Sequence, residues 1–329
     1  MSEIDFISKP DAIERINFYA RNATPFVFII DFKAEKCIVQ SINEIDSDVL
    51  KYTFSEITNS IEVPPNNILL SFEKNPVSFE IFKKAFDQVM AEILYGNSFL
   101  LNLTFETPVK INVDLLEIYH RAQAKYKIWL KDSFVCFSPE TFIKIKKGKI
   151  FSYPMKGTID ASIPNAREII LSDKKEKAEH YTIVDLIRND LNMVAHNVKL
   201  NKFRYIDCLE TNFGDILQVS SEIVGTLPPD YLNKLGEIIF KLLPAGSISG
   251  APKEKTLQII HNAETHKRGF YTGICGYFDG KNLDTGVLIR FIEQREQSFN
   301  FKSGGGITHL STAEAEYQEM IKKIYVPFS

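Results

Sequence analysis

The sequence contains few cysteines and no long apolar run. Cys37, Cys136, Cys208 and Cys275 lie far apart, so neither a CxxC metal site nor a dense disulfide framework is available. No apolar stretch is long enough to cross a membrane, and the N-terminus MSEIDFISKP has neither the basic nor the apolar part of a secretion signal. The sequence therefore predicts a cytoplasmic protein without a membrane partner.

The chain also lacks a block of basic residues. Its 39 Lys and Arg against 42 Asp and Glu give a net charge of −3. Such a chain has no electrostatic footprint for nucleic acid or for an anionic membrane surface. No internal repeat and no long Pro/Gly/Ser-rich linker divides the 329 residues, so a single domain over residues 1–329 is expected.

Hydrophobic periodicity predicts both helices and strands. Helical patterns cover residues 79–95, 113–126, 165–195, 230–243, 253–264 and 312–325. Strand patterns cover residues 25–32, 98–105, 216–226, 271–279, 283–293 and 298–302. Because the strands come in meanders and not in βαβ units, we expect an α+β fold with large antiparallel β-sheets packed together and flanked by helices.

A lysine lies in an unusual setting in the segment PMKGT (154–158). Residues 141–153 read as two short strands around a Lys147–Gly148 turn, which places Lys156 at a strand end between Pro154 and Gly157. A lysine can act as a nucleophile if burial or a neighbouring cation lowers its pKa. The alternative is a turn lysine in solvent, as most lysines are exposed.

Glu140, in the segment SPE, is expected near Lys156 because the two residues flank the same hairpin. A carboxylic acid beside a nucleophilic amine can protonate a leaving group. Glu140 can equally be a surface residue at the start of a strand.

Two predicted helices carry carboxylates three residues apart, Glu176 with Glu179 and Glu316 with Glu319. This spacing puts both members of a pair on one helical face. Carboxylate oxygens suit Mg²⁺, but such faces are often simply solvated. Ser311 with Glu314 also reads as an ordinary capping box at the start of the last helix.

Anion-binding groups are also predicted. Ser303 and the three consecutive glycines that follow it (304–306), before the last helix, can direct backbone N–H groups at one carboxylate, although a tight turn explains them as well. PAGSISGAPK (244–253) is a second Gly-rich loop, and it lacks the Walker A spacing. Arg290 ends the apolar segment LDTGVLIR, where an arginine needs an anionic partner.

Together these motifs resemble those of the chorismate-utilising enzymes, the family of anthranilate, aminodeoxychorismate, isochorismate and salicylate synthases. The resemblance runs in order through SPETF (138–142), PMKGT (154–158), EKAEHYTIVDLIRNDL (176–191), PAGSISGAPK (244–253), RGFYTGICGY (268–277), LDTGVLIR (283–290) and SGGGITHLSTAEAEYQE (303–319). It covers residues 80–325, and residues 1–80 form a divergent N-terminal part in which tryptophan-binding elements are not evident.

Within the family, Lys156 resembles the nucleophile of aminodeoxychorismate synthases, because anthranilate synthases have alanine there. Isochorismate and salicylate synthases carry a lysine base at the place of Leu100. Gln218 stands where most relatives have histidine, and its amide can hydrogen-bond substrate but cannot titrate. The resemblance thus implies the synthase component that aminates chorismate for 4-aminobenzoate and folate biosynthesis. Anthranilate synthase component I and a non-catalytic chorismate-binding subunit are the alternatives.

The resemblance also implies roles for individual residues. Lys156 would attack C2 of chorismate while Glu140 protonates the departing 4-hydroxyl, and ammonia would then add at C4 and release Lys156. Mg²⁺ would be held by Glu179 and Glu319, with Glu176 and Glu316 binding its waters. The implied substrate contacts are Thr158, Gln218, Ser247, Tyr271, Arg290, Gly305 and Gly306.

Nothing in the sequence resembles a glutamine amidotransferase, because no cysteine lies in a nucleophile elbow. A separate glutaminase subunit is therefore expected to supply ammonia. A lyase domain is likewise not evident, so the expected product is aminodeoxychorismate, which a separate aminodeoxychorismate lyase would consume.

Overall fold

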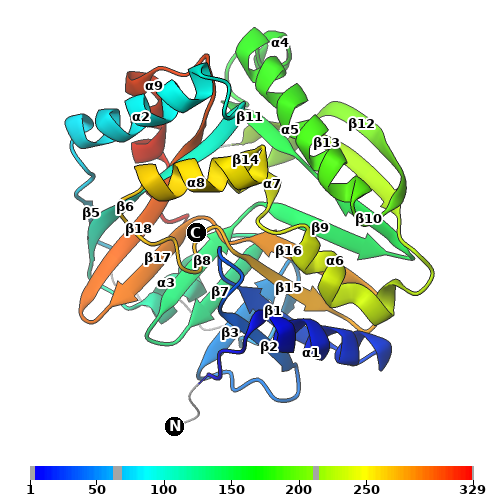
Figure 1. Cartoon of the computed structure of the whole chain (residues 1–329). Coiled ribbons are helices and arrows are strands. Elements are labelled where there is room, and N and C mark those ends of the chain that lie inside the picture. The colour runs from blue at the N-terminus through cyan, green and yellow to red at the C-terminus, as the bar shows by residue number, and fades with distance from the viewer. Residues whose placement is uncertain (1–3, 62–68, 210–214, 328–329) are drawn as a thin grey trace.

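The computed structural model describes residues 4–61, 69–209 and 215–327. In this part of the chain the strands form two antiparallel sheets of nine strands each, and helices cover them (Figure 1). The predicted α+β class with large packed antiparallel sheets is therefore confirmed.

The first sheet has the order β11-β13-β10-β9-β16-β15-β1-β2, with β12 paired to β13. Its strands are β1 (Phe26–Ile30), β2 (Cys37–Ser41), β9 (Thr141–Lys146), β10 (Lys149–Ser152), β11 (Met155–Asp160), β12 (His196–Leu209), β13 (Ile216–Thr226), β15 (Ile274–Phe278) and β16 (Leu283–Val287).

The second sheet has the order β14-β6-β18-β17-β8-β7-β3-β4, with β5 paired to β6. Its strands are β3 (Leu50–Phe54), β4 (Ile57–Thr58), β5 (Phe72–Lys74), β6 (Leu100–Ile111), β7 (Tyr126–Leu130), β8 (Phe134–Ser138), β14 (Gly250–Ala251), β17 (Phe291–Arg295) and β18 (Ser298–Ile307). The chain passes between the two sheets several times, for example from β16 to β17.

The helices lie outside the sheets. They are α1 (Lys9–Arg21), α2 (Phe79–Leu94), α3 (Leu115–Arg121), α4 (Ala166–Ser172), α5 (Lys174–Asn192), α6 (Leu235–Lys241), α7 (Gly246–Ser249), α8 (Lys253–Ala263) and α9 (Ala313–Lys322), with the 3₁₀ turn Tyr231–Lys234 before α6. Helix α1 packs against α6, and α2 packs against α8 and α9. Among the described helices, none is both long and apolar enough to span a membrane.

Two of the predicted helices differ in the structure. The pattern over 165–195 is two helices, because Asp173 takes an extended conformation and its side chain accepts a hydrogen bond from the Glu176 N–H as the N-cap of α5. The pattern over 113–126 is the short helix α3, and Tyr126 already belongs to β7. In both places the hydrophobic periodicity continues past the end of a helix, and the capping residue sets where that helix ends.

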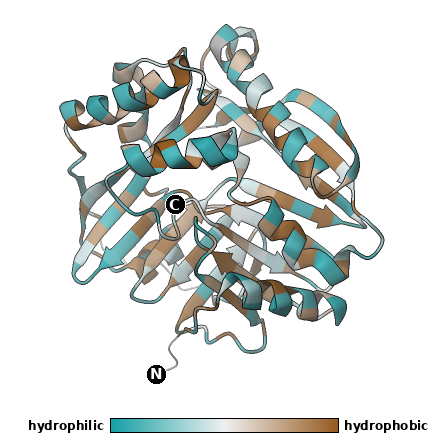
Figure 2. Ribbon diagram, viewed as in Figure 1, coloured by the Kyte–Doolittle hydropathy of each residue, from teal (hydrophilic) through white to brown (hydrophobic). Residues whose placement is uncertain are grey.

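Apolar side chains fill the space between the two sheets and the space beneath the helices. One buried cluster joins Val27 and Ile29 of β1 to Phe54 of β3 and Ile128 of β7, so the sheets pack face to face. Another lies between the first sheet and helices α1, α5 and α6. Figure 2 shows the strands of the interior mostly brown, whereas the outward sides of the helices are largely teal.

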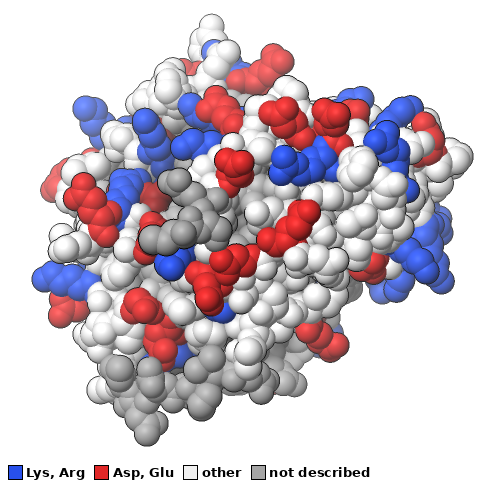
Figure 3. All heavy atoms as spheres, turned by 90° about the horizontal axis from the view of Figure 1, so that it is seen from below, with Lys and Arg blue, Asp and Glu red and all other residues white. Residues whose placement is uncertain are grey.

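Charged side chains of both signs are mixed on the face shown in Figure 3, which is the face seen from below Figure 1. This mixture agrees with the small net charge of −3. A face of this kind does not produce a strong field of one sign.

Candidate active site

A hairpin positions Glu140 and Lys156. Strands β9 and β10 pair antiparallel, with Lys146 opposite Lys149, and are joined by Lys147 (φ 52°) and Gly148 (φ 72°). Positive φ at both residues is the geometry of a type I′ turn, which suits the twist of a two-residue hairpin. The predicted hairpin is therefore confirmed, and its open end holds Glu140 just before β9 and Pro154 just after β10.

Lys156 lies on a bulge and not at a strand end as expected. Residues 155–160 form their own strand, β11, against β13, and the register shifts between the pairs Met155–Ser220 and Thr158–Gln218. Gly157 has φ +87°, a conformation that glycine adopts without strain. Because a bulge re-aims the side chain it contains, it gives Lys156 a direction that regular alternation would not. Thr158 and Gln218 lie directly opposite each other beside this bulge.

The carboxylates of α5 and α9 converge near the bulge. The Lys156 Nζ lies 2.7 Å from Glu179 Oε2. A Cβ placed on Gly157 would lie 3.1 Å from Glu176 Oε2. Helices α5 and α9 are distant in sequence, so only the fold brings their acidic faces to one place.

The second carboxylate pair, on α9, lies beside Gly305 of β18. A Cβ on this glycine would be 3.2 Å from Glu316 Oε2 and 3.9 Å from Glu319 Oε1. The Ser311 hydroxyl donates to Glu316 Oε1 at 2.7 Å, and Thr312 is the N-cap of the helix. The capping-box interpretation of Ser311 and Glu314 is therefore wrong.

The charge state of Lys156 differs from the expectation. Burial acts to lower the pKa of Lys156, but the nearby carboxylates of Glu179, Glu176 and Glu319 outweigh it and hold the pKa above its ordinary value. The lowered pKa that a nucleophilic lysine needs is therefore not present in the chain by itself, because the neighbours of Lys156 are anions. Burial together with repulsion from Glu179 raises the pKa of Glu176, although Lys156 partly offsets both.

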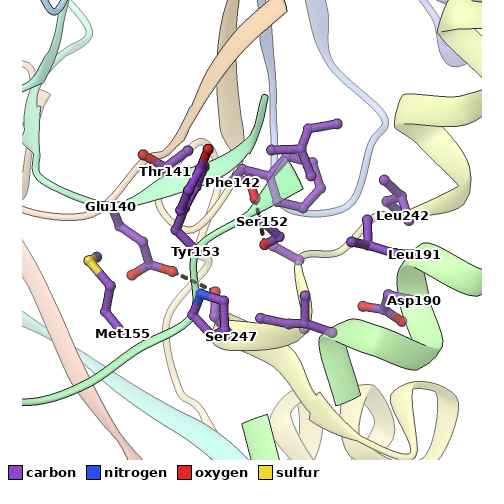
Figure 4. A pocket seen from close by; sticks show the side chains of 15 residues that line it. Glu140, Thr141, Phe142, Ser152, Tyr153, Met155, Asp190, Leu191, Leu242 and Ser247 are labelled. Carbon is purple, nitrogen blue, oxygen red and sulfur yellow. Dashed lines mark hydrogen bonds between the residues drawn. The ribbon is translucent and has the colours of Figure 1, made fainter. Parts of the chain in front are cut away.

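Glu140 is held by Ser247. The Ser247 hydroxyl donates to Glu140 Oε1 at 2.6 Å, and Figure 4 shows the two side chains pointing toward each other from different elements. Burial raises the pKa of Glu140, and Ser247, Arg290, Lys323 and Lys156 only partly offset the shift. A carboxyl group with a raised pKa is suited to donate a proton.

Arg290 lies where the chain crosses between the sheets, and not within a strand as predicted. It follows β16 in the first sheet and precedes β17 in the second, and it adopts φ 56°. Its guanidinium stacks over the Tyr325 ring at 5.4 Å, and its buried Nε has no hydrogen-bond partner among the described residues. An orphaned guanidinium N–H suits an anionic ligand.

Tyr271 is buried beside the same crossing. Its ring packs against Phe291, with centroids 6.0 Å apart. Burial raises the pKa of the Tyr271 phenol, so the group is a neutral hydrogen-bond donor at neutral pH. The charge of Arg290 acts to lower the pKa of the phenol and that of Glu140 acts to raise it, but burial dominates.

Ser303 and the glycines at 304–306 belong to strand β18, and not to a loop. Gly305 pairs with Leu103 and Gly306 with Asn102 of β6, whereas β17 accompanies β18 only as far as Lys302. A Cβ on Gly306 would lie 3.7 Å from Lys156 Nζ and 3.2 Å from Leu100 Cδ1. The backbone of Gly306 therefore lies beside both the Lys156 ammonium and the apolar side chain of Leu100.

The site contains carboxylate oxygens, which are the kind of ligand that a divalent cation such as Mg²⁺ prefers. Glu176 Oε2 is buried without a hydrogen-bond partner among the described residues. Glu176 and Glu179 of α5 lie at the bulge, and Glu316 and Glu319 of α9 lie beside Gly305 of β18. In the described residues, however, no three ligand side chains are close enough together to hold a metal ion. Two of the carboxylates form ion pairs instead. Lys156 Nζ lies 2.7 Å from Glu179 Oε2, and Lys323 Nζ lies 2.7 Å from Glu319 Oε1.

Two residues of the site were missed from the sequence. Lys323 bonds the Gly304 carbonyl at 2.9 Å, and its spacing of four from Glu319 on one helix was a usable signal. His180 is fully buried, with Nε2 2.7 Å from Ser221 Oγ, and the Ser221 N–H donates to the Pro154 carbonyl. Burial lowers the pKa of His180 to about 4, so a neutral imidazole links α5 to the segment before Lys156.

Comparison with known proteins finds a matching family and several relatives. Residues 17–329 match the family described as chorismate binding enzyme, beginning well before residue 80. A Haemophilus influenzae protein named "Uncharacterized PabA-like protein" is 50% identical over 315 residues, which are 96% of each chain. Aminodeoxychorismate synthase component 1 of Bacillus subtilis is 30% identical over 76% of this chain and 55% of its own.

A solved structure shows the same fold. The structure titled as a putative 2,3-dihydroxybenzoate-specific isochorismate synthase from Bacillus anthracis superposes with a TM-score of 0.74. The match covers 98% of this chain and 90% of that one, at 21% identity. At this identity the likeness concerns the fold.

Proposed function

Because the chain belongs to the family of chorismate binding enzymes, we propose that it is the synthase component of an aminodeoxychorismate synthase. It would convert chorismate and ammonia to 4-amino-4-deoxychorismate, with a glutaminase subunit supplying the ammonia. The observation that supports this most is the lysine on the bulge: Lys156 shares one site with Glu140, whose pKa burial raises.

The first half of the reaction requires a nucleophile and an acid. Lys156 must leave its ion pair with Glu179, 2.7 Å from its Nζ, and give up its proton to solvent before it attacks. The Lys156 amine then forms a bond to C2 of chorismate as the bond from C4 to its hydroxyl breaks. Glu140 gives its proton to that oxygen, which leaves as water.

The second half restores the enzyme. Ammonia forms a bond to C4 while the bond between C2 and Lys156 Nζ breaks, and the extra proton of the new ammonium passes to the Glu140 carboxylate. Arg290, Tyr271 and the Gly305 and Gly306 amides would bind the carboxylates of the substrate. Thr158 and Gln218 would contact it from the strands beside the bulge.

Mg²⁺ is part of the proposal. Glu179 and Glu319 would hold it, and Glu176 and Glu316 would bind its waters. When bound, the ion would neutralise the ring carboxylate and draw electron density from the diene. Its approach requires that Lys156 and Lys323 release the carboxylates with which they are paired.

The test withholds ammonia. Intact-protein mass spectrometry after incubation with chorismate and Mg²⁺ should show the mass of chorismate less water, mapped to the peptide with Pro154 to Thr158. Ammonium should then discharge this adduct as 4-amino-4-deoxychorismate. Lys156→Ala should lose both the adduct and the 4-amino product. The control is Lys149→Ala, which replaces an exposed lysine on β10 and should keep both.

Two outcomes would contradict the proposal. Formation of fluorescent anthranilate from chorismate and ammonium would indicate the 2-amino branch. Formation of aminodeoxychorismate by Lys156→Ala at the wild-type rate would show that Lys156 is only a positioning charge.

A further inference from the structure

The main chain that carries Lys156 is not held by regular strand pairing. Strand β11 is the last strand of the first sheet, beside β13. Its register with β13 shifts after Met155 and resumes at Thr158, so Lys156 and Gly157 lie outside the ladder. Other contacts must therefore fix the position of this bulge.

A second bulge lies on the other side of β13. The register between β12 and β13 shifts between Lys202 and Tyr205, and Arg204 there adopts φ 47°. The guanidinium of Arg204 donates to the carbonyls of Ile170 and Leu171 at 3.1 and 2.8 Å. These carbonyls belong to the last turn of α4, where an arginine can bond the free backbone oxygens. The second bulge is thus fixed to a helix.

Ser221 of β13 joins the two bulges to α5. Its N–H donates to the Pro154 carbonyl at 3.0 Å, just before the first bulge. Its hydroxyl accepts from the Arg204 N–H at 3.0 Å, in the second bulge. The same Oγ lies 2.7 Å from Nε2 of His180 on α5, and both side chains are fully buried. One serine therefore connects three segments that are remote in sequence.

The imidazole of His180 has one nitrogen left for the first bulge. Because the Ser221 hydroxyl accepts from Arg204, its own hydrogen points to Nε2, and the proton of the neutral ring lies on Nδ1. Among the described residues, Nδ1 closes no hydrogen bond. Burial has the largest effect on the pKa of His180 and lowers it, whereas the Lys156 backbone carbonyl acts to raise it. This carbonyl therefore lies beside the ring without closing a hydrogen bond.

Helix α5 thereby contacts both ends of Lys156. It lies against β11, β12 and β13 (Figure 1). Glu179 holds the Lys156 ammonium at 2.7 Å, and His180, the next residue, interacts with the main chain of the same lysine. Phe203 meets the imidazole edge-on, with ring centroids 5.9 Å apart, so the ring is packed in place. The ammonium contact must break in the proposed reaction, whereas the main-chain contact can persist.

We propose that His180, held by Ser221, is a positioning residue that keeps the main chain of the Lys156 bulge in place while the lysine attacks the substrate. The inference rests on the proposed function, since it needs Lys156 to be the nucleophile. Once Lys156 has left Glu179, only the position of its main chain limits where Nζ can reach. A misplacement of about 1 Å can cost about 10²-fold in rate.

The first test separates rate from binding. Adduct formation is followed by mass spectrometry without ammonia, at saturating Mg²⁺ and over a range of chorismate concentrations. His180→Ala should lower the maximum rate about 10²-fold. The half-saturating chorismate concentration should stay within about twofold of wild type, because the imidazole does not contact the substrate. Ser221→Ala should lower the maximum rate about five- to tenfold, because it removes one hydrogen bond but keeps the backbone bond to Pro154.

The second test asks which nitrogen of His180 matters. The side-chain amide of asparagine takes the place of Nδ1, and that of glutamine takes the place of Nε2. His180→Asn keeps a donor for the Lys156 carbonyl and should recover about tenfold of the rate that His180→Ala loses. His180→Gln keeps only the contact with Ser221 and should recover less. This comparison also covers the case in which His180→Ala fails to fold.

A control variant measures the effect of a lost buried hydrogen bond by itself. Tyr119 of α3 is buried, and its hydroxyl lies 2.8 Å from Thr53 Oγ1 of β3, in the other sheet. Tyr119→Phe should lower the urea midpoint of unfolding. Its rate of adduct formation should stay within about twofold of wild type, because Lys156 keeps all its contacts.

Three results would overturn the positioning role. They are a wild-type maximum rate in His180→Ala, a loss that appears only in the half-saturating chorismate concentration, and equal rates in His180→Asn and His180→Gln. If the wild-type chain forms no Lys156 adduct, the proposed function is wrong and this assignment falls with it. If wild type forms the adduct and the His180 variants behave like Tyr119→Phe, only the positioning role is wrong.

Discussion

Replacing Lys156 by methionine should tighten the binding of Mg²⁺ to the chain, even as it removes the proposed nucleophile. In the proposed mechanism, the Lys156 ammonium and Mg²⁺ would compete for the same Glu179 carboxylate. Methionine keeps much of the apolar stem of lysine and removes only the charge. The ion would then no longer have to displace an ammonium from a side chain that is 5% exposed.

The magnitude follows from the geometry of the pair. At 2.7 Å, Coulomb's law gives roughly 6 kcal/mol at an effective dielectric constant of about 20 and roughly 1.5 kcal/mol in bulk water. Lys156 is 27% exposed, so its share of the gross attraction is reduced by solvent. A net value of about 1.5–3 kcal/mol is typical of a hydrogen bond between charged groups. This range corresponds to a gain in Mg²⁺ affinity of about 10- to 150-fold.

Isothermal titration calorimetry with Mg²⁺ and no chorismate measures this gain directly. Lys149→Met, on the exposed side of β10, is the matched control and should leave the affinity unchanged. Glu179→Gln should weaken binding, because it removes a charged oxygen ligand from a hard cation. An affinity for Mg²⁺ in Lys156→Met that equals or falls below that of wild type would refute the competition.

Three further outcomes are expected. Gly306→Ala should fold like wild type but lose product formation, since its methyl would stand 3.7 Å from Lys156 Nζ. Gly304→Ala should instead unfold at a lower urea concentration, because its Cβ would lie 2.3 Å from the Leu103 carbonyl oxygen. Burial lowers the pKa of His266 to about 4. The contribution of His266 to the free energy of unfolding should therefore fall by up to about 3 kcal/mol as pH falls from about 6.5 to 4, and His266→Gln should reduce the urea-monitored slope to the part that His180 contributes. Ser247→Ala should slow adduct formation and shift its pH profile upward, because the 2.6 Å hydrogen bond that lowers the Glu140 pKa is lost.

The sequence determined the elements whose signals are local. Alternation of apolar residues around Lys147–Gly148 predicts a hairpin, and the structure confirms it with positive φ at both turn residues. The meander pattern predicts antiparallel sheets, because the strands do not come in βαβ units. The carboxylate pairs share helical faces because spacing alone fixes that geometry.

Local signals also misled where two conformations fit one pattern. Residues 303–306 read as a turn because glycine is common in turns, yet β6 pairs with them along their length. Arg290 read as the end of one strand, although its strand stops at Val287 and another begins at Phe291 in the other sheet. Both errors arise because strand pairing depends on partners far away in the chain.

The tertiary structure alone decided the electrostatics and the space of the site. The sequence offered a lysine whose pKa burial would lower, but the fold sets it against Glu179 from α5, so its pKa is raised. A small cavity at Glu140 has walls from β9, β10, α5 and the segment before α7. Charge pairs and cavities depend on distances between segments that are remote in sequence, and only the packed chain fixes those distances.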